Sequence, residues 1–187
     1  MTSPAVEQEL VMARSIAWLE HAVIGLNFCP FAKAVHVKKK ICWVITLATD
    51  ADALHSDLRA ALLQLKRAPM TTIETTILIH PYVLTDFADY NNFLARADAL
   101  IVELGLEGDL QIASFHPDYC FADARPQDLS NATNRSPYPM LHLLRENSIS
   151  DAIQIYPDAN SIVARNQATL ARLGQREWET LAKNFAK

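Results

Sequence analysis

The chain has 187 residues, 50% of them hydrophobic, and a formal net charge of −4 at pH 7. The length predicts one domain over residues 1–187 with a sizeable core. The acidic balance excludes a general attraction to nucleic acid or to an anionic membrane. The one basic run, residues 38–40, is interpreted as a solvated turn, with a phosphate-binding patch as the alternative.

No segment of the sequence reaches the roughly 20 continuous apolar residues of a membrane span. The N-terminal residues also lack the charged-then-apolar layout of a signal peptide. The three cysteines form no CxxC pair, so we expect neither a disulfide framework nor a zinc knuckle. A reducing, cytoplasmic location is therefore expected.

The first part of the chain predicts a helix followed by a strand. Ser3 and Pro4 together are a helix-start signal, and apolar residues then recur at helical spacing toward Gly25. Pro30 interrupts or restarts this helix. Residues 41–47, ICWVITL, form a nearly continuous apolar run, which predicts a strand covered on both faces.

Helices and strands continue to alternate in the rest of the chain. The middle part predicts a helix over residues 54–65, a strand ending at residue 80, a helix from 85 or 86 to 104, and a strand over 110–116. The last part predicts a helix running on from residue 137, a short strand over 152–157, and helices over 158–173 and 176–185.

Strands separated by helices of about 12 to 18 residues imply crossover connections. We therefore expect an α/β fold: a single domain with a mostly parallel sheet of about four strands and helices packed on it. An α+β arrangement with some antiparallel pairing is the alternative, because periodicity leaves the strand order open.

Two of the predicted strands end in the same dipeptide, His80 with Pro81 and His116 with Pro117. If these strands are parallel, both imidazoles emerge at the carboxyl edge of the sheet, where open α/β sheets bind ligands. Each proline holds the preceding histidine extended. We predict both histidines as catalytic candidates, with His116 as a general acid or base. The alternative is that His-Pro simply terminates each strand.

A long irregular segment follows His116. It covers 19 residues, 117–135, whereas most connections have about 4 to 6. Its aromatic residues and its Asp and Asn side chains, which can cap the backbone, favour an ordered loop. We interpret it as a functional loop in which Asp118 orients the His116 imidazole.

Ser136 and the proline at position 137 predict the start of a helix. Free amides at a helix start suit a carboxylate or a phosphate. Tyr138, His142 and Arg145 would share one stripe of this helix. The predicted substrate-binding residues are Asn134, Arg135, Ser136, Tyr138, His142 and Arg145. The alternative is an exposed helix face on which Arg135 pairs with an acidic residue such as Asp128.

Cys29 lies directly before Pro30, as the possible cap of a short helix near several lysines. A thiol in that position ionises more readily and can act as a nucleophile. The alternative is a small buried hydrophobe. A metal site made of Cys29, His80 and His116 has suitable ligand types for zinc but no motif spacing, so none is predicted. With only four glycines, the chain also has no Gly-rich phosphate loop.

Several stretches of the chain resemble a known family. These stretches are LNFCPFAK, LIHPYVLTDFADYNNFL, FHPDYCFA, NATNRSPYPMLHLLRE and IYPDANSIVARNQATLARLG. The sequence resembles the bacterial family called Domain of Unknown Function 1415 from about Leu10 to Gly174. The resemblance places Cys29, His80, His116, Asp118, Asn134, Arg135, Pro137, Tyr138 and His142 in the family's signature stretches. It implies no activity, since the family name carries none.

Two functions from different classes are consistent with these residues. The first is an enzyme that acts on a small anionic metabolite by hydrolysis or group transfer, because no cofactor motif occurs. The second is a non-catalytic module that binds a metabolite or a protein partner through the same loop and helix. Convergence of His116, Cys29 and Arg135 on one cleft would favour the enzyme.

Overall fold

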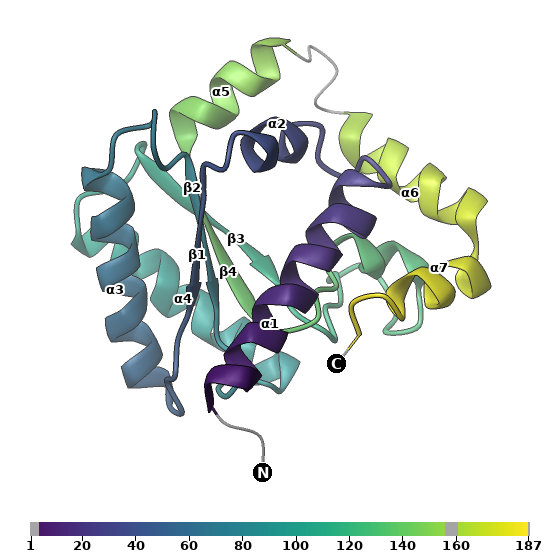
Figure 1. Ribbon diagram of the computed structural model, residues 1–187, viewed down its shortest axis with the longest axis horizontal. Helices are drawn as coiled ribbons and strands as arrows, with labels where there is room; N and C mark the ends of the chain where they lie inside the picture. The colour runs from purple at the N-terminus through teal and green to yellow at the C-terminus, as the bar shows by residue number, and fades with distance from the viewer. Residues whose placement is uncertain (1–3, 156–160, 187) are drawn as a thin grey trace.

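A four-stranded sheet at the centre of the protein separates two groups of helices (Figure 1). The computed structural model describes residues 4–155 and 161–186. The strands are β1 (Ile41–Ile45), β2 (Thr75–Ile79), β3 (Leu110–Phe115) and β4 (Met140–Arg145). The α-helices are α1 (Pro4–Trp18), α2 (Ala32–Val37), α3 (Ala51–Arg67), α4 (Phe87–Glu103), α5 (Glu146–Ile155), α6 (Ile162–Leu173) and α7 (Gln175–Ala182). A π-helix, η1 (Leu19–Ile24), continues α1, and a 3-10 helix, η2 (Leu129–Thr133), lies in the long loop.

The helices and strands predicted before residue 117 are present. Local signals set their limits: the Asp50 carboxylate accepts hydrogen bonds from two backbone amides at the start of α3, and Asp86 does the same for α4. After α4, Gly105 adopts a φ of 64°, a left-handed conformation that glycine reaches at little cost. At the N-terminus, the predicted cap Ser3 lies outside the described residues.

The sheet is mixed, so the prediction of a mostly parallel sheet is wrong. The strand order is β1-β2-β4-β3, in which β1 and β2 are parallel and β4 is antiparallel to both of its neighbours. Because β2 and β3 both run opposite to β4, they run parallel to each other. The alternative with some antiparallel pairing describes the sheet correctly.

The helix predicted to start at Pro137 is a strand in the structure. Residues 140–145 form β4, which lies between β2 and β3. A proline restricts the residue before it to extended conformations, so Pro137 and Pro139 disfavour a helix at Ser136 and Tyr138. Four of the six residues of MLHLLR are apolar, and the sequence suits a central strand as well as it suits a helix.

The strand predicted over residues 152–157 is also wrong for the residues that are described. Residues 146–155 form α5, and residues 156 and 157 lie outside the described part of the chain. Ile149, Ala152 and Ile153 follow helical spacing, and so short an apolar run cannot be assigned by its periodicity alone.

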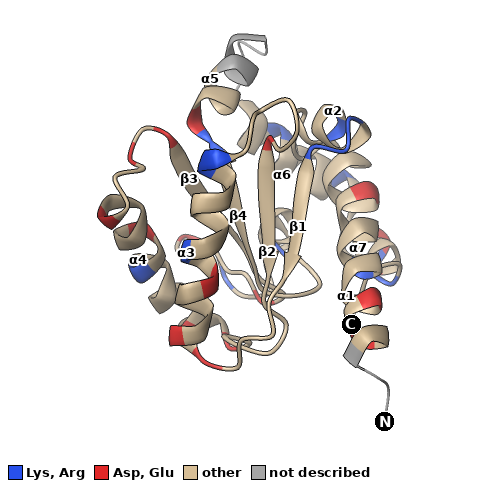
Figure 2. Ribbon diagram, turned by 60° about the vertical axis from the view of Figure 1, so that its left-hand side comes forward, with Lys and Arg blue, Asp and Glu red and all other residues tan. Residues whose placement is uncertain are grey.

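Each face of the sheet has its own hydrophobic core. Leu78, Leu141 and Leu143 point to one face and pack under α3 and α4. Ile77, Ile79 and Met140 point to the other face, where α1, η1, α6 and α7 contribute side chains. Figure 2 shows α3 and α4 on one side of the sheet and α1 and α7 on the other. Since side chains alternate along a strand, each strand supplies both cores.

Candidate functional site

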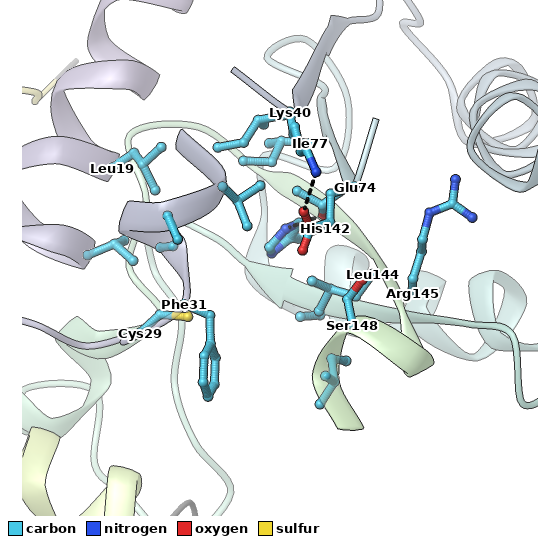
Figure 3. Close-up of a pocket in the computed structure, with 18 of the residues that line it drawn as sticks. Leu19, Cys29, Phe31, Lys40, Glu74, Ile77, His142, Leu144, Arg145 and Ser148 are labelled. Atoms are coloured by element: carbon cyan, nitrogen blue, oxygen red, sulfur yellow. Dashed lines mark hydrogen bonds and ion pairs between the residues drawn. The ribbon is translucent and has the colours of Figure 1, made fainter. Parts of the chain in front are cut away.

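A cavity of about 720 Å³ lies over the sheet face that carries His142 (Figure 3). All four strands contribute to its floor, including Ile41 of β1, Ile77 of β2, Ala113 of β3 and His142 of β4. Residues of α1, η1 and α2, the residues just before β2, and the start of α5 form its walls. Its size falls within the range of roughly 300–1,000 Å³ typical of small-molecule sites.

The pleat of β4 places His142 in this cavity. Met140, His142 and Leu144 line the cavity, whereas Leu141 and Leu143 belong to the core on the opposite face. In the strand register His142 lies between Ile77 of β2 and Ala113 of β3. The small Ala113 side chain leaves space beside the imidazole.

His142 is bonded to a neighbouring hydroxyl on the same face of the sheet. Its Nε2 lies 2.7 Å from Thr75 Oγ1, and Thr75 Oγ1 donates a second, 2.6 Å hydrogen bond to the carbonyl of Leu143. Burial lowers the pKa of His142 to about 4, so the imidazole is neutral at pH 7. His142 was predicted as a residue of a helix stripe, but it reaches the cavity from a strand.

An ion pair lies among the described residues of the cavity. Lys40 Nζ is 3.6 Å from the Glu74 carboxylate, and both side chains are largely buried (Figure 3). Lys40 belongs to the basic run 38–40, in which Lys38 and Lys39 are exposed. The solvated-turn interpretation therefore describes two of the three lysines, while the third lines the cavity.

Cys29 lines the same cavity and is partly buried. It does not cap α2, whose N-cap position is Phe31. Burial raises the pKa of the Cys29 thiol, against the opposite effect of backbone hydrogen bonds at Phe31 and Ala32. The expectation that this thiol ionises readily is therefore wrong in direction, because desolvation outweighs the backbone amides.

Arg145 also borders the cavity, but its guanidinium is directed elsewhere. Its Nη2 donates hydrogen bonds to three backbone carbonyls, Leu65 at 2.5 Å, Ala68 at 2.6 Å and Ile73 at 3.3 Å. These carbonyls lie at the C-terminal end of α3 and just beyond it. Figure 3 shows the Arg145 side chain pointing away from His142. Arg145 thus caps a helix end, where a positive charge is favourable.

The two His-Pro histidines lie at the same edge of the sheet, as their parallel strands require. The Tyr90 ring lies between them, stacked on His80 at a centroid distance of 5.7 Å and tilted against His116 at 5.1 Å. Both histidines are fully buried. Neither lines the cavity that contains His142.

The ring nitrogens of these histidines bond mainly to backbone groups. His80 Nδ1 donates to the Val83 carbonyl at 2.9 Å, and its buried Nε2 has no partner among the described residues. His116 Nε2 donates to the Leu84 carbonyl at 3.2 Å. His116 Nδ1 accepts from the backbone amide of Asp118 at 3.0 Å. Asp118 therefore orients the His116 ring through its amide, while its side chain is exposed.

The side chains of the predicted anion-binding residues Asn134 and Arg135 are hydrogen-bonded to backbone carbonyls. Arg135 Nε donates to the Tyr119 carbonyl at 3.2 Å, and its Nη2 donates to the Pro126 carbonyl. Asn134 Nδ2 donates to the Ser114 carbonyl at 3.1 Å. Arg135 ties the loop to itself and Asn134 ties it to β3. The suggested Arg135–Asp128 pair is not the one formed, since Asp128 pairs with Arg125 at 3.0 Å.

Ser136 and Tyr138 are buried in the segment that enters β4. Ser136 Oγ donates to the Tyr138 carbonyl at 2.6 Å, and the Tyr138 hydroxyl accepts from Arg14 Nη1 at 3.1 Å. Of the ten predicted site residues, the structure brings only Cys29, His142 and Arg145 to the cavity. His116, Cys29 and Arg135 do not meet in it.

Sequence reasoning missed the residues that surround His142. Trp18, Glu74, Thr75 and Ala113 line the cavity, but no motif marks them. Lys40 also lines it and was noted only as part of the basic run 38–40. The available signal was the strand period in MLHLLR, which places His142 on one face between two apolar residues. Among residues 4–155 and 161–186, no group of three or more His, Cys, Asp or Glu side chains could hold a metal ion.

The fold and the cavity together define a mixed α/β protein with one sheet face partly open beneath helices. None of the helices in the described ranges has the length and apolar character that crossing a membrane requires. Residues 10–180 match the family described as Protein of unknown function (DUF1415), and the chain belongs to this family. Comparisons with curated proteins and with solved structures gave no match.

Proposed function

We propose that this protein binds a small, mainly apolar organic molecule in the cavity over the sheet. The observation that carries the proposal is the space of about 720 Å³ beside a neutral, partly buried His142. Trp18, Phe31 and Phe115 supply large apolar surfaces to this space. Apolar walls with a few fixed polar groups are typical of ligand sites.

An enzyme acting on an anionic metabolite at the His116 loop remains the expectation from sequence, with less geometric support. Both ring nitrogens of His116 are bonded to the backbone, and Arg135 bonds to carbonyls of its own loop. A general acid or base needs a nitrogen within reach of the substrate. These contacts favour a structural role for the loop, and hence the binding function.

Filling the cavity tests the binding function. Ala113 lies beside His142, so Ala113→Phe inserts a ring into the proposed ligand volume. Ala95→Phe is the matched control, because Ala95 is exposed on α4 and α4 packs on the opposite face of the sheet. We expect Nile red, a neutral apolar dye, to show saturable fluorescence with the wild type and with Ala95→Phe.

We expect Ala113→Phe to weaken Nile red binding at least tenfold while circular dichroism shows an unchanged fold. Equal affinity of all three proteins would contradict the proposed site, and so would the absence of saturable binding to the wild type. A folded Ala113→Phe protein is required for the comparison; if it unfolds, Ala34→Phe on α2, which also lines the cavity, replaces it.

A further inference from the structure

The hydrogen-bonding state of His142 restricts the chemistry of the ligand. Resting on the binding function proposed above, we infer that the cavity takes an uncharged molecule whose O–H or N–H group donates a hydrogen bond to His142 Nδ1. Phenols, alcohols and aromatic N–H compounds have this chemistry. The inference follows from the number of protons that Thr75 and His142 share.

Thr75 has one hydroxyl proton and two close partners. The Leu143 carbonyl oxygen, 2.6 Å from Thr75 Oγ1, can only accept, so the Thr75 proton is used there. His142 Nε2, 2.7 Å from the same oxygen, must then be the donor of the second bond. This assignment places the proton of the neutral imidazole on Nε2, since a neutral ring carries one N–H.

His142 Nδ1 is consequently an unprotonated acceptor. No group in the described part of the chain forms a hydrogen bond with Nδ1. Nδ1 is also not one of the fully buried polar atoms without a partner, so it remains accessible. Burial keeps the imidazole neutral, with a pKa of about 4. Ala113 and Ile77, its neighbours in the register, have no polar side-chain atoms that could satisfy Nδ1.

The charged side chains around the cavity favour an uncharged ligand. Lys40 and Glu74 neutralise each other at 3.6 Å. Arg145 Nη2 donates to the carbonyls at the end of α3, and Figure 3 shows this side chain pointing away from His142. Ser148 Oγ also belongs to the lining and is buried with no hydrogen-bond partner among the described residues. An anion beside His142 would therefore find Lys40 already paired with Glu74 and Arg145 directed away, and a carboxylate oxygen would face the lone pair of Nδ1.

Three probes of one shape separate the possibilities: naphthalene, 2-naphthol and 2-naphthoate. They share the apolar ring system and differ in carrying no polar group, a hydroxyl donor or a carboxylate. A hydrogen bond contributes roughly 0.5–1.5 kcal/mol net, which corresponds to about a twofold to tenfold change in affinity. At pH 7 we expect the wild type to bind 2-naphthol more tightly than naphthalene by this factor, and 2-naphthoate least.

Two variants assign the preference to His142. His142→Phe keeps a ring but removes the acceptor, so 2-naphthol should lose its advantage over naphthalene. His21→Phe makes the same substitution at an exposed histidine of η1 that does not line the cavity, and it should leave the preference unchanged. In ¹⁵N-histidine NMR spectra, 2-naphthol should shift the unprotonated Nδ1 resonance of His142 to lower frequency, whereas naphthalene should not.

The outcomes distinguish this inference from the binding function on which it rests. Equal binding of 2-naphthol and naphthalene, tightest binding of 2-naphthoate, or a preference that persists in His142→Phe would overturn the donor assignment and leave the cavity as a binding site. A proton on Nδ1 in the NMR spectra would overturn it as well. If none of the three probes binds, both the inference and the proposed binding function fail.

Discussion

Burial lowers the pKa of three histidines, and it brings the pKa of His80 and of His142 to about 4. For His80 the nearby His116 imidazole adds to the effect of burial, while the bond to the Val83 carbonyl opposes it. An imidazole in the unfolded chain has a pKa near roughly 6.5. The unfolded state therefore binds protons that the folded state excludes, and the free energy of unfolding falls as the pH falls.

Because of this linkage, we expect the free energy of unfolding to fall between about pH 6.5 and pH 4. The protonation of His80 in the unfolded chain accounts for part of this decrease. From pH 7 to pH 4.5 the His80 share is roughly 2–3 kcal/mol. His80→Asn keeps a nitrogen that can donate to the Val83 carbonyl but does not titrate. We expect this variant to be less stable at pH 7 and to lose less of its free energy of unfolding on acidification, as measured by urea denaturation across the pH range.

An exposed histidine provides the control for this experiment. His21 is exposed in η1, so His21→Asn should keep the steep pH dependence of the wild type. If His80→Asn also kept the full wild-type slope, His80 would not be the group that couples protonation to unfolding.

At the scale of elements, one side chain of β4 fixes the end of α3. The Arg145 guanidinium donates to the carbonyls of Leu65, Ala68 and Ile73 and so satisfies groups that a helix end leaves unpaired. We expect Arg145→Met to lower the free energy of unfolding by about 2–4 kcal/mol, because charge-assisted bonds are lost together with their partners' pairing. Chemical denaturation followed by circular dichroism measures the change.

A surface arginine sets the scale for that comparison. Arg96 pairs with Asp52 at 2.8 Å between exposed side chains, and such pairs contribute about 0–1 kcal/mol. Arg96→Met should therefore cost much less than Arg145→Met. An equal loss in the free energy of unfolding would mean that water satisfies the carbonyls at the end of α3 as well as Arg145 does.

The elements that the sequence predicted correctly are those with local signals. α3 and α4 begin at capping aspartates and carry apolar faces at helical spacing, and β1, β2 and β3 are short apolar runs. The segment of β4 was predicted as a helix, and residues 152–157, which overlap α5, were predicted as a strand. Over a few residues, MLHLLR and ENSISDAIQI are compatible with both the helical and the strand period. The place of β4 between β2 and β3 is a long-range property, and no local pattern encodes it.

At the scale of the whole molecule, the candidate site arises from packing that the sequence does not display. The shared edge of His80 and His116 was predictable from two strand ends, and Tyr90 joins them there. The position of His142 was not, since its cavity needs four strands from one side and α1, η1, α2 and α5 from the other. The long loop was marked by its length and irregular pattern, yet several of its polar side chains bond to backbone carbonyls of the same loop.

The two faces of the sheet differ in how completely side chains fill the space above them. Adjacent residues of β4 lie on opposite faces and allow the two to be compared. Leu143 is fully buried in the core under α3 and α4, whereas Leu144 is partly exposed and lines the cavity. Truncating a leucine in a filled core costs about 2–5 kcal/mol, because lost contacts leave a void. Truncating one that already borders a void removes fewer contacts.

We therefore expect Leu143→Ala to lower the free energy of unfolding by roughly 3–5 kcal/mol and Leu144→Ala by about 1 kcal/mol. Ligand affinity should show the reverse order, since Leu144 contributes to the cavity floor and Leu143 does not. Urea denaturation and Nile red titration of both variants measure the two quantities. Equal destabilisation by the two truncations would mean that the cavity side is as tightly packed as the core under α3 and α4, and a protein packed equally on both faces would have no room for a ligand.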